Sequence, residues 1–330
     1  MTMTGSVRWG IVGTAKIART LFLPSLREAG GEPAAVAARD RDRATAWAAA
    51  NGAARAIVGY ENLIEDPAVD ALYIPLPNAL HGEWTIRALR AGKPVLCEKP
   101  LTGSVAETEQ VLAVARDTGT PLWEAFAFPF HDQMARLRSL LADGTIGDLQ
   151  EIQSDFYFHM SDRDTNVRMS TVLAGGALLD VGCYPVRLAR DLFGAEHESA
   201  WAQAEYDAGG VDVTTWGCLN FPGGRHLYLS CGFSRADDTF SRLLGTGGQI
   251  NITNPFHPRA ADTFEVRVNG REPVTHRGAG PNKQSFTPVI QHIQAVITGA
   301  EAPRLLAVDT ALGSALALQD LAVSAAKTPA

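Results

Sequence analysis

An apolar run in residues 94 to 101, PVLCEKPL, ends in two opposite charges. The pattern is typical of a buried strand that ends at Glu98 and Lys99, directly before a proline. Ligands of open α/β sheets bind at the carboxyl ends of the strands, so this pair could face a binding site. The preceding apolar run ends in PLPNALH and would deliver further residues to the same edge: Pro75, Asn78 and His81. The alternative is a strand that emerges at the surface, where Glu and Lys are common.

A second stretch, residues 175 to 194 (GGALLDVGCYPVRLARDLFG), has two glycines that lead into an apolar amphipathic helix. The helix carries Asp180 and Tyr184, one turn apart on one face. A carboxylate and a phenol need hydrogen-bond partners if they are buried there. The alternative is a capped, partly exposed helix face, where Asp and Tyr are common.

The composition indicates a globular enzyme with two domains. The chain has 330 residues, 46% hydrophobic and 20% charged, and this length exceeds what one core usually organises. The net charge of −7 includes no basic block, which argues against nucleic acid or an anionic membrane as partner. We see no apolar run near the ~20 residues of a membrane span and no signal peptide. Four widely spaced cysteines indicate reduced thiols in a cytoplasmic protein, and no histidine pair has metal-ligand spacing, so we expect no metal site.

The first third of the chain alternates short apolar runs with helical patterns. Strands are expected at 7 to 12, 33 to 38, 70 to 76, 93 to 98 and 120 to 126. Helices are expected at 15 to 29, 42 to 52, 79 to 92 and 104 to 119, with Pro24 breaking the first into two pieces. This alternation predicts an α/β domain with a doubly wound parallel sheet, which we assign to residues 1 to 125.

After about residue 126 the apolar residues alternate with a period of two. Strands are expected at 149 to 159, 199 to 207, 212 to 221, 225 to 233 and 263 to 270, with a hairpin turn at 221 to 226. Two helices follow, near 283 to 299 and at 308 to 327. Residues 126 to 330 are therefore predicted to form an α+β domain with a large, mostly antiparallel open sheet.

A possible phosphate site lies at the turn after the first strand, in GIVGTAKIA. The segment occupies the register of a G-x-G-x-x-G dinucleotide fingerprint, with alanine in place of the second and third glycines, and its candidate contacts are Gly13, Thr14, Ala15, Lys16 and Ile17. Small residues there let backbone N–H groups approach a pyrophosphate. Any small strand-to-helix turn gives the same pattern, but the position in the first α/β unit favours a dinucleotide.

The second strand ends in AARDRDR, where the adenosine ribose of a dinucleotide would bind. Arg39 and Arg43 could accommodate a 2′-phosphate, whereas Asp40 would favour the free ribose of NAD. We favour NADP because Arg39 comes first, and NAD remains possible. A solvated helix N-terminus of mixed charge is the alternative.

These segments together resemble the Gfo/Idh/MocA oxidoreductases, the glucose–fructose oxidoreductase and inositol dehydrogenase superfamily. The similarity covers most of residues 7 to 194 and rests on the Glu-Lys-Pro triplet and on the segment DVGCYP. It implies a Rossmann domain followed by an α/β domain with an open, mostly antiparallel sheet that often supports homodimers or homotetramers. Members with tyrosine at the position of Tyr184 include xylose and dihydrodiol dehydrogenases and nucleotide-sugar 3-ketoreductases.

The resemblance also implies roles for individual residues. Tyr184 corresponds to the family's acid–base residue, Lys99 to its lysine, and Asp180 to a carboxylate that orients the substrate. Arg168 matches a position near the cofactor. Phe128 and His131 are expected to line the pocket for a carbohydrate-like substrate. Their segment, FAFPFHDQ, departs from the family's usual sequence, which puts the family's usual substrate in doubt.

The chemistry implied is hydride transfer between a nicotinamide and a carbonyl carbon, with a proton moving at the oxygen. A free tyrosine has a pKa near ~10, and a nearby ammonium group favours its phenolate. Lys99 would supply that charge and bind a substrate or ribose hydroxyl, while Glu98 would restrain Lys99 or the nicotinamide side. We also expect a cis bond before Pro100, as is frequent in the family.

Two other functions remain open from the sequence. A relative that keeps its NAD bound can hydrolyse glycosides through transient oxidation. Another type binds the dinucleotide as a non-catalytic regulator, although such a protein has no need for Lys99, Asp180 and Tyr184 together.

Overall fold

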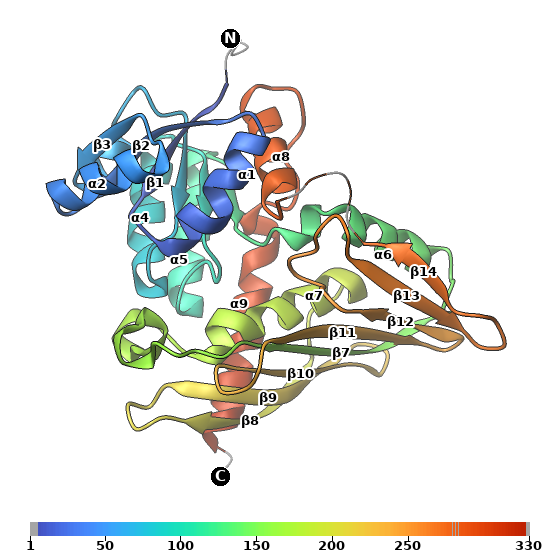
Figure 1. Ribbon diagram of the computed structural model, residues 1–330. Coiled ribbons are helices and arrows are strands. Elements are labelled where there is room, and N and C mark those ends of the chain that lie inside the picture. The colour runs from blue at the N-terminus through green and yellow to red at the C-terminus, as the bar shows by residue number, and fades with distance from the viewer. Residues whose placement is uncertain (1–5, 279, 281, 283, 328–330) are drawn as a thin grey trace. The chain divides into compact units, whose positions relative to one another are not determined.

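The chain folds into two compact units, shown in the computed structural model in Figure 1. The structure describes residues 6–278, 280, 282 and 284–327. The first unit comprises Met1–Phe126 and Asn282–Leu312, and the second comprises Ala127–Pro281 and Gly313–Ala330. Each unit is built around its own sheet, so the two are described separately.

The first unit contains a six-stranded parallel sheet with the strand order β3-β2-β1-β4-β5-β6. Its strands are β1 (Arg8–Val12), β2 (Glu32–Ala38), β3 (Arg55–Val58), β4 (Ala71–Ile74), β5 (Val95–Cys97) and β6 (Leu122–Glu124). The order reverses between β1 and β4, on either side of the first strand. In doubly wound sheets this reversal point is where a ligand binds, beyond the carboxyl ends of the strands.

Helices cover this sheet. They are α1 (Leu23–Glu28), α2 (Arg41–Asn51), α3 (Tyr60–Ile64), α4 (Asn78–Arg90), α5 (Val105–Thr118), α8 (Thr287–Ile297) and the first part of α9 (Ala307–Lys327). One core joins the buried faces of the strands to α4 and α5, with Leu72, Leu89 and Leu112 fully buried. Ser104 caps α5 by accepting a bond from the Glu107 N–H.

The helix after β1 changes type at Pro24. A π-helical segment, η1 (Ala18–Phe22), leads into α1, whose first residues include Pro24. Phe22 and Leu23 both keep helical dihedral angles, so the predicted break is a change of helix type within a continuing helix. Proline lacks an N–H and cannot continue the regular pattern, and early helix positions tolerate it best.

The second unit contains an eight-stranded mixed sheet with the order β14-β13-β12-β11-β7-β10-β9-β8. Its strands are β7 (Leu149–Tyr157), β8 (Ser199–Tyr206), β9 (Asp212–Phe221), β10 (Arg225–Gly232), β11 (Asp238–Gly245), β12 (Gly248–Ile252), β13 (Thr263–Val268) and β14 (Val274–Arg277). Neighbours pair antiparallel except β7 and β10, which are parallel. Phe221 pairs with Arg225, which confirms the hairpin predicted between β9 and β10.

The helical elements of this unit lie mainly on one side of the sheet. They are η2 (Phe128–Phe130), α6 (Asp132–Ala142), η3 (Arg163–Thr165), η4 (Val167–Met169), η5 (Thr171–Leu173), η6 (Leu178–Gly182), α7 (Cys183–Phe193) and the rest of α9. Figure 1 shows α7 along the face of β7 and β10, with which it is in contact. Trp201 and Tyr228 both pair with Cys218, so their side chains share the opposite face, where they are 48% and 46% exposed.

The fold class is confirmed, with a parallel sheet followed by a mostly antiparallel one. The sequence analysis did not predict the helix α6, nor several short or charged elements: β3, α3, β11, β12 and β14. In β11 the inward positions include Ser241, whose hydroxyl bonds the buried hydroxyl of Ser154 at 2.7 Å. Two serines paired across a buried face break the apolar alternation by which strands are recognised.

The sequence analysis expected no segment apolar enough to span a membrane, but one segment meets that criterion. Thr171–Phe193 is long and apolar enough to cross a membrane by length and composition, and 72% of its most apolar window is buried inside the protein. A core helix of a soluble protein passes the same test, and α7 supplies that core contact to the sheet.

The aromatic packing behind the first helix should dominate the stability of the first unit. Phe22 is fully buried, stacked on Tyr73 at 4.0 Å and edge-on to Trp9 at 5.4 Å between ring centroids. Phe22→Ala is expected to lower the free energy of unfolding by about 3–5 kcal/mol because it leaves a cavity. Urea denaturation measures this, with Val323→Ala, at a position 45% exposed, as the control within about 0.5 kcal/mol. Equal effects of the two substitutions would contradict this account of the core.

Candidate active site

The turn after β1 is shaped for close approach of the backbone. Gly13 has φ +100°, and a Cβ there would lie 2.8 Å from Cδ2 of Leu76. Its N–H donates to the carbonyl of Ala37 at 2.9 Å, which ties the turn to the end of β2. Thr14, Ala15 and Ile17 are half-buried and Lys16 is exposed. The turn therefore presents small residues at the start of a helix, as a pyrophosphate requires.

The charged residues after β2 comprise a helix-capping carboxylate and two exposed guanidinium groups. The Asp40 carboxylate accepts a bond from the Arg43 N–H at 2.8 Å and so caps α2. The Arg43 side chain reaches back and donates from Nε to Oγ1 of Thr14 at 2.6 Å. Arg39 and Arg43 are both exposed. The carboxylate that would favour NAD is thus engaged at a helix end, while positive charge borders the first turn.

Lys99 lies at the carboxyl end of β5, in a segment that is held on several sides. Lys99 is 7% exposed and Glu98 is 6% exposed. The Glu98 carboxylate accepts bonds from the Tyr73 hydroxyl at 2.6 Å and from the backbone N–H of Lys99 at 3.2 Å. The bond from Lys99 to Pro100 is cis, as expected from the sequence. Glu98 therefore restrains the backbone of Lys99.

The other side of this segment is held by His81 and Glu124. His81 is fully buried at the start of α4, with Nδ1 2.9 Å from the carbonyl of Pro100 and Nε2 2.7 Å from that of Leu76. Burial lowers the pKa of His81, and the two carbonyls act against that shift. Glu124 accepts a bond from the N–H of Leu101 at 2.8 Å. His81 thus supports the segment around Lys99 from within the fold.

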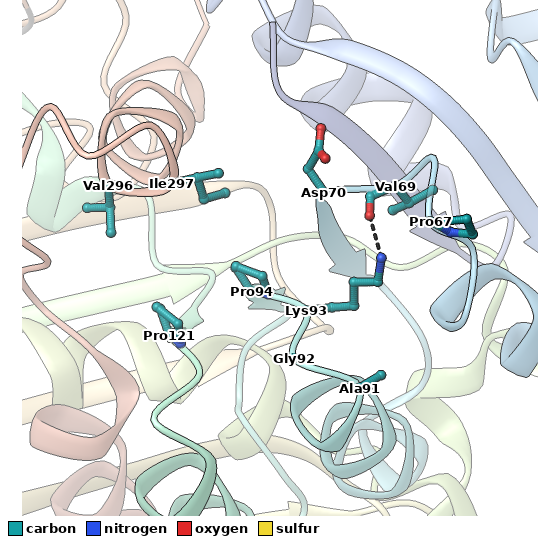
Figure 2. A pocket seen from close by; sticks show the side chains of 10 residues that line it. All are labelled: Pro67, Val69, Asp70, Ala91, Gly92, Lys93, Pro94, Pro121, Val296 and Ile297. Atoms are coloured by element: carbon teal, nitrogen blue, oxygen red, sulfur yellow. Dashed lines mark hydrogen bonds between the residues drawn. The ribbon is translucent and has the colours of Figure 1, made fainter. Parts of the chain in front are cut away.

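A cavity of about 470 Å³ in the first unit lies at the other edge of its sheet. Figure 2 shows residues that precede β4, β5 and β6, together with two residues of the α8 end, and they include Pro67, Asp70, Lys93, Pro94, Pro121 and Ile297. Lys93 donates from Nζ to the carbonyls of Asp66 and Val69 at 2.9 and 2.6 Å. These are the amino ends of parallel strands, where dinucleotides do not bind. The cavity is therefore separate from the predicted cofactor edge.

In the second unit, Asp180 forms an ion pair with Arg168. Arg168 donates from Nε to Oδ2 of Asp180 at 2.6 Å, and its guanidinium lies 5.9 Å from the ring centre of Phe158. The Asp180 side chain is 11% exposed and that of Arg168 is 40% exposed. The partner that a buried carboxylate requires comes from η4, twelve residues earlier in the chain.

A second carboxylate, that of Asp212, holds the start of the helical segment that carries Asp180 and Tyr184. Asp212 accepts bonds from the N–H of Leu178 at 2.7 Å and the hydroxyl of Thr215 at 2.9 Å. A Cβ on Gly176, which has φ +112°, would lie 2.0 Å from Oδ1 of Asp212. The second glycine of the GG pair is therefore required for both its backbone angle and its contact. Burial raises the pKa of Asp212 to about 6, against the bonds that it accepts.

Tyr184 lies in a cluster of aromatic rings. Its ring centre is 5.1 Å from those of Phe156 and Phe256 and 6.4 Å from that of Phe128. Its hydroxyl lies 3.4 Å from Nε2 of His257. Tyr184 is 5% exposed, so the phenol is almost completely surrounded by protein.

Three further predicted site residues, His131, Pro75 and Asn78, are buried or half-buried. His131 is 2% exposed at the first position before α6, and its carbonyl accepts a bond from the Met134 N–H. Pro75 is buried beyond β4, and Asn78 is half-buried at the start of α4. Across the described residues, no group of three or more His, Cys, Asp or Glu side chains could hold a metal ion.

Both units match known proteins. Residues 7–126 match the oxidoreductase family with an NAD-binding Rossmann fold, and residues 134–251 match the GFO/IDH/MocA C-terminal domain. The chain belongs to the Gfo/Idh/MocA oxidoreductases. It is therefore an NAD(P)-dependent oxidoreductase, and the predicted resemblance is confirmed.

Three relatives within the Gfo/Idh/MocA family illustrate the match. The chain is 38% identical to a dTDP-3,4-didehydro-2,6-dideoxy-alpha-D-glucose 3-reductase from Streptomyces violaceoruber, over 88% of this chain and 85% of the relative. It is 35% identical to D-xylose 1-dehydrogenase (NADP(+)) 2 of Haloferax volcanii, over 90% and 91% of the two chains. A crystal structure of a 3-ketoreductase from Actinomadura kijaniata in complex with NADP and TDP-benzene superposes with a TM-score of 0.88 at 31% identity, covering 97% of this chain and 98% of that one.

The structure assembles the predicted site residues of this Gfo/Idh/MocA protein in two groups. The first unit brings the turn after β1, the arginines after β2 and the Lys99 segment to the carboxyl edge of one sheet. The second unit brings Arg168 to Asp180 and Phe128 to Tyr184. Since Lys99 and Tyr184 belong to different units, their approach remains a prediction. The sequence analysis did not identify four residues of these sites: Tyr73, Glu124, Asp212 and His257. Only Asp212 had a signal, because it begins the alternating segment that forms β9.

The raised pKa of Asp212 gives a prediction about stability and pH. Folded protein keeps the Asp212 proton up to about pH 6, whereas the unfolded chain releases it near pH ~4. Ionisation of Asp212 therefore lowers the free energy of unfolding as the pH rises from about 4 to 6. Asp212→Asn lacks this loss, so its stability relative to the wild type should increase over that range, by up to about 3 kcal/mol.

Urea denaturation from pH 4 to pH 7 measures this difference. Asp143→Asn, which removes an exposed carboxylate on the same unit, serves as the control. A constant difference between Asp212→Asn and the wild type across the range would show that Asp212 does not titrate in this way.

Proposed function

We propose that this protein uses NADP to interconvert a hydroxyl and a carbonyl group on a sugar or sugar-like substrate, with reduction of a keto-sugar as the favoured direction. The observation that carries the proposal is similarity along both units to relatives named as a nucleotide-sugar 3-reductase and a xylose dehydrogenase. Burial of Lys99, Asp180 and Tyr184 adds support. Buried polar side chains require hydrogen-bond or charge partners, whereas exposed ones are satisfied by water.

The residues would divide the chemistry between charge and proton transfer. The nicotinamide, when bound, supplies or accepts the hydride. Tyr184 donates its phenolic proton to the substrate oxygen in reduction and takes it back in oxidation. Lys99 favours the phenolate by its positive charge, which brings tyrosine closer to useful acidity near neutral pH. Asp180, fixed by Arg168, orients a substrate hydroxyl.

The cofactor contacts follow from the first unit. The backbone of residues 13 to 17 would hold the pyrophosphate, and Arg39 and Arg43 would hold the 2′-phosphate. Pro75, Asn78 and Glu98 would border the nicotinamide, with His81 acting from behind the segment that carries Lys99. Arg168 completes the predicted cofactor contacts, while Phe128 and His131 complete those of the substrate. Phe128 has direct support from its packing beside Tyr184.

We also propose the division of labour along the chain. Residues 1 to 125 would bind the dinucleotide, and residues 126 to 330 would bind substrate and form the oligomer contacts. The exposed aromatic side chains of Trp201 and Tyr228 on the open sheet face support a homodimer or homotetramer. The thiol content fits a cytoplasmic enzyme, since Cys97, Cys183, Cys218 and Cys231 form no disulfide bond.

Replacement of the two central residues tests the mechanism. Tyr184→Phe and Lys99→Ala should each lower turnover by about 10²–10⁴-fold, because each removes part of the proton transfer step. NADPH consumption is followed at 340 nm with a panel of keto-sugars, and NADP reduction with a panel of aldoses. NADPH affinity, measured by fluorescence titration, should change little in Tyr184→Phe.

Matched surface substitutions control this experiment. Tyr206→Phe and Lys327→Ala alter exposed side chains of the same types and should keep wild-type turnover. Near-normal turnover in Tyr184→Phe or Lys99→Ala would rule out the assignment. Sugar release without net change in cofactor would identify a glycosidase instead.

Cofactor preference can be tested at the end of β2. Arg43→Ala should raise the Kd for NADPH by about tenfold or more, because a charged hydrogen bond to the 2′-phosphate is lost. The Kd for NADH should change by less than about threefold, since NADH lacks that phosphate. Arg90→Ala, an exposed arginine at the end of α4, is the control. An equal loss of affinity for both cofactors would contradict the NADP assignment.

A further inference from the structure

The phenol of Tyr184 faces a histidine that sequence reasoning did not identify. Nε2 of His257 lies 3.4 Å from the Tyr184 hydroxyl, and the ring centres are 5.4 Å apart. We propose that His257 is a positioning residue that relays protons between the buried phenol of Tyr184 and solvent. This proposal rests on the proposed role of Tyr184 as the proton donor.

Burial of the phenol creates the need for such a relay. Tyr184 is 5% exposed and has the aromatic rings of Phe128, Phe156 and Phe256 around it. After each reduction the phenolate must regain a proton, and apolar rings cannot supply one. His257 is only half-buried, and we infer that its ring connects the phenol, which Nε2 approaches, with water. Hydrogen bonds of this kind are often long before substrate binds, as 3.4 Å is here.

The loop that carries His257 is fixed at its backbone. The side chain of Asn254 accepts a bond from the His257 N–H at 3.2 Å and donates to the His257 carbonyl at 2.7 Å. The buried side chain of Gln133 donates to the carbonyls of Asn254 and Pro255 at 3.1 and 3.4 Å. The N–H and the carbonyl of His257 are thus both held by one side-chain amide. Such fixation is what an aligned proton path requires.

The neighbouring ring of Phe256 anchors the same loop in the cluster. Phe256 is fully buried and stacks on Phe156 with ring centres 5.6 Å apart and planes within 9°. Phe156 in turn lies edge-on to His257 at 6.1 Å. Phe156 and Tyr184 are themselves 5.1 Å apart, so the imidazole lies against both rings, beside the phenol.

Charged and titratable groups near this path come from three elements. Asp262 accepts bonds from the side chain of Asn254 and from the N–H of Arg259, both at 2.7 Å. Asp180 and Arg168 pair beside the start of the helix that carries Tyr184. The Tyr184 hydroxyl is in hydrogen-bond range of the His257 ring, and the proposed function places the ammonium of Lys99 near the same phenol.

The proton balance in reduction is simple. The phenolic O–H of Tyr184 breaks, and its proton forms an O–H bond on the substrate oxygen. The Nε2–H of a protonated His257 then gives its proton to the phenolate, and the neutral imidazole takes a proton from water or buffer. In oxidation each transfer runs in reverse. No further oxidant or reductant is needed, because the relay moves protons alone.

The first test measures the link between the two side chains without any substrate. The protein is labelled with [13Cζ]tyrosine, and the signal of Tyr184 among six tyrosines is assigned by its loss in Tyr184→Phe. In the wild type this signal should shift between about pH 5 and 8, where histidine side chains titrate. His257→Gln should abolish that shift. His276→Gln, which replaces a histidine stacked on Phe264 in the same unit, should leave it intact.

The second test measures turnover with the substrate found in the sugar panel. His257→Gln should lower kcat by about tenfold with little change in KM, a smaller loss than for removal of the direct proton donor. Imidazole in the buffer should restore much of the kcat of His257→Ala, because a free imidazole can replace the missing relay. A merely structural histidine would show neither rescue nor a changed pH profile.

The outcomes separate the two proposals. If Tyr184→Phe keeps turnover, the proposed function fails and the relay fails with it. If Tyr184→Phe loses turnover while His257→Gln keeps the wild-type pH profile, the relay alone is overturned. The NMR titration of the wild type decides the matter even if the His257 variants do not fold, since absence of a Tyr184 shift between pH 5 and 8 would overturn the relay.

Discussion

Burial of the polar groups is the constraint on which the rest of both sites depends. Glu98, Lys99, Asp180 and Tyr184 are each exposed by 8% or less. Removing such groups from water costs several kcal/mol per charge unless hydrogen bonds and opposite charges compensate. The hydroxyl of Tyr73 compensates Glu98, and the guanidinium of Arg168 compensates Asp180. Geometry at the site is therefore fixed by the need to satisfy these groups.

The same constraint explains how much of the site could be predicted. The types and local spacing of Lys99, Asp180 and Tyr184 were readable because each interrupts an apolar segment. Their partners were not readable, since Arg168 comes from a separate short helix and Asp212 from the first position of a strand. Pairing of this kind depends on how distant strands and helices pack, and a single sequence records no such register.

The fold was predictable to a similar degree. Long periodic segments such as α4, α5 and the β9–β10 hairpin were found close to their observed bounds. Short elements with charged or hydroxyl side chains were missed, β3 and β11 among them, because their alternation is not apolar. The parallel pairing of β7 with β10 could not be predicted either. The two strands are far apart in the sequence, and nothing in their residues specifies that they pair with each other.

The first unit is completed by residues from near the end of the chain. Gln294 bonds the indole of Trp9 at 3.4 Å, the hydroxyl of Thr287 bonds Glu28, and the carbonyl of Arg304 accepts from the indole of Trp123 at 3.1 Å. During synthesis on the ribosome, these partners emerge only after residues 127 to 281, which contain the whole sheet of the second unit, have been made. The nucleotide-binding half therefore cannot finish folding first, although it is encoded first. Its last contacts form at about the same time as those of the half that follows it.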